Sequence, residues 1–66
     1  MPLYLTQRER EVLKGIMDGK NSKEVADKLF VSKRTVDFHL ANIYGKLGVK
    51  TRMQAAIKVK ELNIVL

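Results

Sequence analysis

The chain has 66 residues, enough for one small domain, and its lack of cysteine excludes a disulfide framework and a cysteine-based zinc site. Its single histidine cannot form a metal-binding cluster, and no apolar stretch approaches the roughly 18 residues that a membrane helix needs. Lys and Arg number 13 against 7 Asp and Glu, and the formal charge of +6 favours a polyanion such as nucleic acid as the partner, although a basic surface also simply keeps a small domain soluble.

The first predicted helix covers about residues 6–18. Thr6 is followed three residues later by Glu9, the pattern of a capping box in which a hydroxyl and a carboxylate each accept a free backbone N–H. Gly19 is a natural left-handed stop. Gly15 predicts close packing against another helix, because glycine inside a helix costs about 1 kcal/mol relative to alanine. One apolar stripe recurs at helical spacing: Val12, Leu13, Ile16 and Met17.

The second predicted helix is short, about residues 22–29, with Asn21 or Ser22 as its cap. A tight turn must follow it, because the capping signal starts again at Ser32. The third helix is predicted over about residues 32–47, with an amphipathic stripe formed by Val36, Leu40, Ile43 and Leu47. It ends at Gly48, where a left-handed residue allows Val49 to pack back toward Tyr44 in a Schellman-type cap.

The last predicted helix covers about residues 51–62 and begins with a second capping-box pattern, Thr51 followed by Gln54. Its apolar residues lie on two sides, so one side is available to a partner when the other enters the core. No stretch shows the strict alternation of a strand. We therefore expect an all-α fold, a single four-helix domain over residues 1–66.

The second and third helices have the spacing of a helix-turn-helix, in which the second of the pair enters the major groove of DNA. The small Ala26 lets the two helices cross closely, Val31 fills the corner, and Val36 anchors the third helix from below. Phe30 lies where many such turns have glycine. Because a bulky residue with positive φ is strained, we expect this turn to adopt a variant geometry.

The chain resembles the LuxR/GerE-type DNA-binding domain of bacterial transcription regulators, over nearly its whole length from about residue 5 to residue 62. The matching positions are Leu5-Thr6-x-Arg8-Glu9-x-Glu11-Val12-Leu13, Ser22-Lys23-Glu24-Val25-Ala26, Leu29-x-Val31-Ser32-x-x-Thr35-Val36-x-x-His39, Asn42-Ile43-x-x-Lys46-Leu47-Gly48-Val49 and Arg52-x-Gln54-Ala55. The resemblance implies sequence-specific binding of double-stranded DNA. Both a stand-alone regulator and the C-terminal domain of a longer one fit this pattern.

Phosphate contacts position such a domain, and two basic clusters suit them. The first is the start of the third helix, where side chains and free N–H groups meet phosphate oxygens, unless the turn is merely solvated. Similar family members add contacts from the start of the last helix. The candidate phosphate ligands are Lys33, Arg34, Thr35, Lys50, Thr51, Arg52, His39 and Lys46.

Base contacts are expected from the exposed face of the third helix, namely from Asp37, Phe38, Ala41 and Asn42. Here the chain departs from its relatives, many of which carry Lys or Arg where Asp37 stands. A carboxylate is repelled by phosphate, yet it can accept a hydrogen bond from a cytosine amino group. The alternative is that Asp37 simply pairs with Lys33 or Arg34 along the helix.

The last helix commonly pairs two such domains on a palindromic site, and we expect a homodimer through Ala55, Val59 and Leu62 or their neighbours. The alternative is a monomer that dimerises only on DNA.

An enzyme is not expected, because the chain has no glycine-rich phosphate loop and no polar cluster able to close a pocket, and no cofactor or metal is expected either. The competing function is a protein-binding adaptor that docks on RNA polymerase or another regulator. RNA is a weaker third possibility, since the chain has only two Phe and two Tyr and no strand platform. The first residues lack the basic flank and length of a secretory signal, so we expect a cytoplasmic, nucleoid-associated protein without membrane contact.

Overall fold

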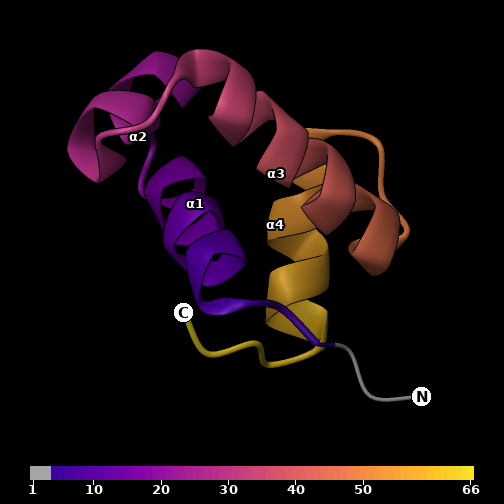
Figure 1. Ribbon diagram of the computed structural model, residues 1–66. Coiled ribbons are helices and arrows are strands. Elements are labelled where there is room, and N and C mark those ends of the chain that lie inside the picture. Colours follow the sequence, from indigo (N-terminus) through magenta and orange to yellow (C-terminus); the bar gives the residue numbers. More distant parts are fainter. Residues whose placement is uncertain (1–3) are drawn as a thin grey trace.

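The computed structural model describes residues 4–66, in which four helices and no strands occur. The helices are α1 (Gln7–Met17), α2 (Ser22–Leu29), α3 (Lys33–Leu47) and α4 (Arg52–Glu61). Figure 1 shows α2 beside the N-terminal end of α3, α1 below this pair, and α3 crossing α4. The all-α class with four helices is confirmed.

Polar caps determine where the helices begin. Thr6 Oγ1 accepts the Glu9 N–H at 3.1 Å, and Glu9 Oε1 accepts the Thr6 N–H at 2.9 Å, so the predicted capping box is present. Of the two cap candidates for α2, the structure selects Asn21, which forms a second reciprocal box with Glu24. Because the predicted ranges of α1, α3 and α4 included the cap, each of those helices starts one residue later than its range.

The cap of α4 differs from the prediction in one bond. Thr51 Oγ1 accepts the Gln54 N–H at 3.1 Å as expected. Gln54 Oε1 instead accepts the N–H of Lys50 at 2.8 Å, one residue before the cap, so the box is not reciprocal. The side chain satisfies a backbone donor of the loop rather than one of the cap residue itself.

The core contains one stripe from each of the first three helices and a single alanine of α4. Gly15 lies where α1 meets α2, and a Cβ at that position would be 2.7 Å from Val25 Cγ2. The close packing predicted from this glycine is therefore confirmed. Ala26 is 2% exposed at the crossing of α2 and α3, as the helix-turn-helix spacing required. The largest fully buried side chains are Leu13, Ile43, Val12, Val25 and Val36.

At the ends of α2 and α3, the C-cap residue itself has the left-handed conformation. Gly48 has φ +70°, and the Val49 N–H donates to the Tyr44 carbonyl at 3.0 Å, which confirms the predicted Schellman-type cap. Phe30 ends α2 in the same way, with φ 58° and ψ 43°, and the Val31 N–H donates to the Ala26 carbonyl at 3.0 Å. The expected variant geometry was wrong, because the turn keeps the glycine-like conformation and places the ring outside, 94% exposed.

The inward side of α4 is the one that carries Ala55. This residue is 0% exposed, and Val59 is half-buried against the same core. The other apolar side of α4 lies outside, with Met53 75% and Ile57 54% exposed. The core therefore takes part of the face that the sequence had assigned to a partner.

Replacing Phe30 by glycine should stabilise the domain by about 0.5–1 kcal/mol, because the left-handed penalty of about 1–2 kcal/mol that it removes exceeds the extra chain entropy of glycine, about 0.5–1 kcal/mol. The ring is exposed, so its loss removes little packing. Urea unfolding followed by circular dichroism measures this gain. Gly48→Ala is the matched control, since its new Cβ meets no atom within 4 Å and only the φ of +70° is tested. That variant should lose about 1 kcal/mol. A Phe30→Gly variant less stable than the parent would show that the ring has a packing role.

Candidate nucleic-acid interface

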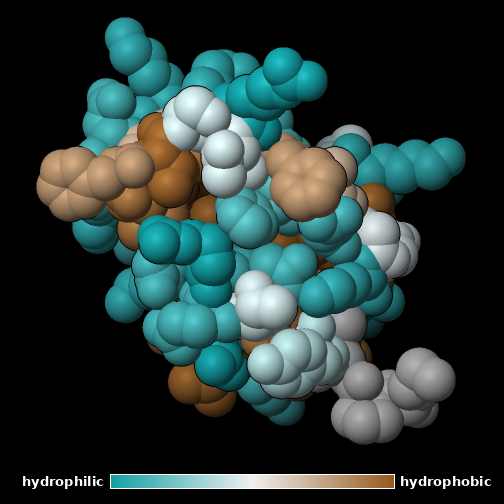
Figure 2. Space-filling model, viewed as in Figure 1, coloured by the Kyte–Doolittle hydropathy of each residue, from teal (hydrophilic) through white to brown (hydrophobic). Residues whose placement is uncertain are grey.

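One long face of α3 is turned away from the core. Val36, Ile43 and Leu47 are at most 4% exposed on its inner side. The opposite side presents an exposed row that we call the α3 outer face: Lys33, Arg34, Asp37, Phe38, Ala41 and Asn42. All four predicted base-reading residues therefore share one accessible helix surface. Figure 2 shows a mostly hydrophilic molecular surface in this view, with apolar residues gathered over α2 and the turn to α3.

The first turn of α3 combines free N–H groups with basic side chains. Ser32 Oγ accepts the Thr35 N–H at 3.1 Å and lies 3.0 Å from Thr35 Oγ1, so both hydroxyls belong to the cap. Lys33 Nζ donates to Asp37 Oδ2 at 2.7 Å. Arg34 is exposed and takes part in none of the ion pairs found among residues 4–66. In this turn Arg34 thus presents its charge outward, while that of Lys33 is paired.

Asp37 is paired along the helix, as the alternative interpretation predicted. The hydrogen bond from Lys33 lowers the pKa of the Asp37 carboxyl, and the Ser22 side chain at the start of α2 lowers it further. Both interactions stabilise the anionic form, so the outer face of α3 carries a carboxylate at neutral pH. The ion pair itself does not exclude a base contact, because both side chains remain largely exposed.

Further along α3, the outer face combines apolar side chains with the single amide of Asn42. Phe38 is 64% exposed, and its ring meets that of His39 in an edge-on arrangement with centroids 6.1 Å apart. His39 is half-buried at the border of the core, where its spacing had placed it. Ala41 and Asn42 are both exposed. An aromatic ring and a methyl group suit apolar contact with thymine methyl groups.

The residues of the second predicted phosphate cluster differ in what they contact. Lys50 and Thr51 are exposed at the start of α4. Arg52, by contrast, donates from Nη2 to the Ile16 carbonyl at 3.1 Å and so caps the C-terminal end of α1. Its guanidinium ties α4 to α1, a role that the sequence analysis did not assign to it.

Lys46 is also engaged within the domain. Its Nζ lies 2.6 Å from Glu9 Oε1 and 5.9 Å from the centroid of the Tyr4 ring. Glu9 is 4% exposed, so the pair joins the start of α1 to the last turn of α3 through a buried carboxylate. The assignment of Lys46 as a phosphate ligand missed this partner. The sequence spacing could have indicated that Glu9 is buried, because Glu9 lies four residues after Leu5 and four before Leu13, on the buried face of α1.

The ion pair determines how Glu9 titrates. Burial raises the pKa of its carboxyl, but the hydrogen bond and charge of Lys46, together with bonds from Thr6, outweigh burial and hold the pKa below its ordinary value. Glu9 is therefore ionised in the folded domain at neutral pH, and its pair stabilises the fold above the pKa of the unfolded chain.

The predicted dimer residues are not equally accessible. Ala55 has no exposed surface, so its assignment to a dimer contact was wrong, because the residue is needed to close the core. Val59 is half-buried against that core, and Leu62 is 51% exposed. The side of α4 that offers apolar surface to a partner is the one with Met53, Ala56 and Ile57.

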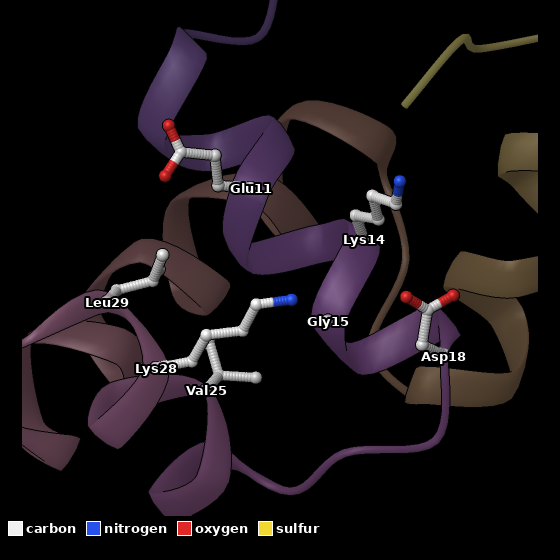
Figure 3. Close-up of a pocket in the computed structure, with 7 residues that line it drawn as sticks. All are labelled: Glu11, Lys14, Gly15, Asp18, Val25, Lys28 and Leu29. Carbon is white, nitrogen blue, oxygen red and sulfur yellow. The ribbon is translucent and has the colours of Figure 1, made fainter.

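A groove of about 190 Å³ between α1 and α2 has an apolar floor formed by Gly15, Val25 and Leu29. Figure 3 shows that the carboxylates of Glu11 and Asp18 on its rim point away from one another, so the acidic groups do not converge on a common point. Within residues 4–66, no three His, Cys, Asp or Glu side chains are grouped to hold a metal ion. No helix in the same part of the chain has the length and apolarity to cross a membrane.

Comparisons with known proteins agree with this geometry. The family model GerE, described as bacterial regulatory proteins of the luxR family, matches residues 3–59. The spore germination protein GerE of Bacillus subtilis (strain 168) is 47% identical over 59 residues, which are 89% of this chain and 80% of GerE. The transcriptional activator protein AnoR of Acinetobacter nosocomialis is 44% identical over 63 residues, which are 96% of this chain but only 26% of AnoR.

Solved structures show the same fold. The structure of the transcription factor GerE has a TM-score of 0.83 and 35% sequence identity, and the match covers 96% of this chain and 92% of that chain. A chain from the crystal structure of the anti-activator RapF complexed with the response regulator ComA DNA binding domain also has a TM-score of 0.83, at 37% identity over 86% of this chain and 98% of that chain.

Glu9→Gln should destabilise the domain by about 1–3 kcal/mol at pH 7, because Lys46 loses its partner while the amide oxygen keeps the Thr6 cap. Since the native pKa of Glu9 is lowered, the difference from the parent should shrink as the pH falls below about 4.3. Thermal unfolding across a pH series measures this. Glu24→Gln is the matched control, because Glu24 has the same capping role at an exposed site, and it should change stability by less than about 0.5 kcal/mol. Equal losses in both variants would contradict a special role for the buried pair.

Proposed function

Since the chain belongs to the luxR family of bacterial regulatory proteins, we propose that it inserts the α3 outer face into the major groove of duplex DNA and reads a short half-site there. The chain is a DNA-binding domain of the LuxR/GerE type, and its family members regulate transcription. It acts through binding rather than catalysis, in the cytoplasm and on the nucleoid.

The packing of α3 is the observation that carries this proposal. A helix that enters the major groove must be buried on one side and free along the other over several turns. The inner residues Val36, Ile43 and Leu47 are almost wholly buried, while the α3 outer face is exposed over its whole length. The turn before α3 is short, so α2 braces the N-terminal end of the inserted helix.

Phosphate contacts on either side of the groove determine the position of the domain along the DNA. Arg34 and the free N–H groups of the first turn of α3 bind one strand, and Lys33 contributes when it releases Asp37. Lys50 and the Thr51 hydroxyl bind a second stretch of backbone from the start of α4. Thr35 and His39 lie at the edge of this surface, and Lys46 and Arg52 act mainly within the domain, since both have intramolecular partners.

Two copies bind a palindromic site through the exposed side of α4. Met53, Ala56 and Ile57 are spaced to share one face, whereas Leu62 is exposed at the end of α4 on a different side of the helix. Pairing of two small domains raises affinity and doubles the number of base pairs that are read.

A protein-binding adaptor is the second candidate function. The exposed apolar side chains on α4 favour it, as does the RapF–ComA structure, in which a related DNA-binding domain is complexed with another protein. RNA polymerase or another regulator would be the partner. Salt separates the two functions, because DNA binding that neutralises several phosphates weakens steeply with salt and an apolar interface does not.

Selection from a randomised duplex pool at two salt concentrations tests the proposed function. We expect enrichment of a short palindrome that is retained less well at the higher salt. If no sequence is enriched and retention is negligible even at low salt, the adaptor function replaces DNA binding.

Arg34→Ala should weaken DNA binding about tenfold across all sequences and reduce the salt dependence by about one counterion, because it removes one phosphate contact. Fluorescence anisotropy on the selected duplex and on a scrambled duplex, each at several salt concentrations, measures both effects. Arg10→Ala is the control, since Arg10 is exposed on α1 and its loss changes the net charge equally. Equal weakening by both variants would show that Arg34 acts only through the overall charge.

Ile57→Asp should prevent cooperative binding of two copies to the palindrome while leaving binding to a single half-site within about twofold of the parent. Sedimentation of the complex with each duplex gives the stoichiometry. Gln7→Asp adds the same carboxylate at an exposed position on α1 and should leave the two-copy complex intact. A two-copy complex that survives Ile57→Asp would place the dimer contact elsewhere.

A further inference from the structure

We propose that Asp37 determines sequence specificity by selecting half-sites that present a cytosine amino group to its carboxylate. This inference rests on the proposed insertion of α3 into the major groove. It goes further by naming the base that the domain requires and the side chain that imposes the requirement.

Few side-chain atoms on the α3 outer face can form hydrogen bonds with bases. Phe38 and Ala41 have no side-chain group that can form a hydrogen bond with a base. Asp37 precedes Phe38 and is exposed, and its ionised carboxyl group can only accept hydrogen bonds. Asn42 lies more than one turn further along α3, so a base edge that meets Asp37 must offer its carboxylate a donor.

Two base edges carry donors in the major groove, the N4 amino group of cytosine and the N6 amino group of adenine. Adenine places its N7 acceptor beside the amino group, so a carboxylate that approaches its edge also meets a lone pair. Cytosine has no such neighbour on its own edge. Thymine and guanine present O4, or O6 and N7, which are acceptors only and repel the carboxylate. Asp37 therefore favours cytosine and rejects the other bases to different degrees.

The ion pair with Lys33 makes an acidic residue tolerable in this position. Lys33 Nζ lies 2.7 Å from Asp37 Oδ2, which reduces the repulsion between the carboxylate and the phosphates that line the groove. The Ser22 side chain, at the start of α2, further lowers the pKa of the Asp37 carboxyl and so favours its charged form. The bond from Lys33 uses Oδ2, so Oδ1 remains for a base contact.

The preference of Asp37 for cytosine arises mainly because the other bases bind less well at this position. A wrong base leaves the carboxylate desolvated in the groove without a donor, and an unsatisfied polar group is costly to bury. We expect the parent domain to bind the half-site with cytosine at the Asp37 position about tenfold more tightly than the half-sites with thymine or guanine there.

The test measures binding to the selected duplex with each of the four base pairs substituted at every half-site position, for the parent and for Asp37→Asn. An asparagine side chain has the same shape and offers both a donor and an acceptor, which match adenine N7 and N6. We expect one position at which the parent prefers cytosine and at which Asp37→Asn prefers adenine instead. Because Asp37 is exposed, we expect the variant to fold as the parent does, and circular dichroism checks that the helices remain.

Two further variants separate specificity from charge. Asp18→Asn changes the net charge equally at an exposed site on α1 and should keep the cytosine preference. Lys33→Met removes the partner of Asp37, so it should weaken binding to every sequence several-fold and also keep the cytosine preference. If the parent enriches no sequence at all, the proposed function fails together with this inference. If the parent enriches a site that Asp37→Asn reads with unchanged base preference, DNA binding stands and the role of Asp37 is overturned.

Discussion

The rest of the structure depends on the burial of one side of α3. Val36, Ile43 and Leu47 bring this helix into contact with α1, α2 and α4, so each of the other helices supports it from below. A domain of this size buries only a small core, and within residues 4–66 the opposite side of α3 is left exposed. The helix that packs against all three others therefore also projects a long, exposed face. This constraint joins stability and DNA binding in one element, because a substitution on the inner stripe would move the reading surface as a whole.

Some basic side chains of this domain bind groups within the fold and are not free to bind a ligand. The formal charge of +6 suggests an evenly basic surface, but three of the basic side chains on or near the predicted interface have intramolecular partners. Lys46 pairs with the buried Glu9, and Arg52 caps the last turn of α1. Among the predicted phosphate ligands, Arg34 and Lys50, at the starts of α3 and α4, are exposed and form none of the ion pairs found within residues 4–66. We therefore expect DNA affinity to depend more on where the unpaired cations lie than on how many basic residues the chain contains.

The sequence alone predicted the local features well, because caps and glycine stops act over three to five residues. Thr6, Asn21, Gly15 and Gly48 each have the role that their patterns indicated. The sequence did not predict two contacts between distant segments, Lys46 with Glu9 and Arg52 with Ile16. It also did not predict which side of α4 faces the core. The face of α4 was ambiguous because apolar residues occur on two of its sides, and only packing against α3 selects Ala55. Phe30 shows the opposite case, in which a local preference was overridden because the tight turn between α2 and α3 requires a left-handed residue whatever its side chain. The assignment of individual DNA contacts stays a prediction.

A nuclear magnetic resonance titration of the ¹⁵N-labelled domain with its selected duplex tests the central claim most directly, because each backbone amide reports on its own surroundings. We expect the largest shift changes along the α3 outer face, from Lys33 to Asn42, with a second group at Lys50 and Thr51. The amides in the middle of α1 should change little. Large changes confined to α4 or to the groove between α1 and α2, with α3 unaffected, would contradict the insertion of α3 into DNA.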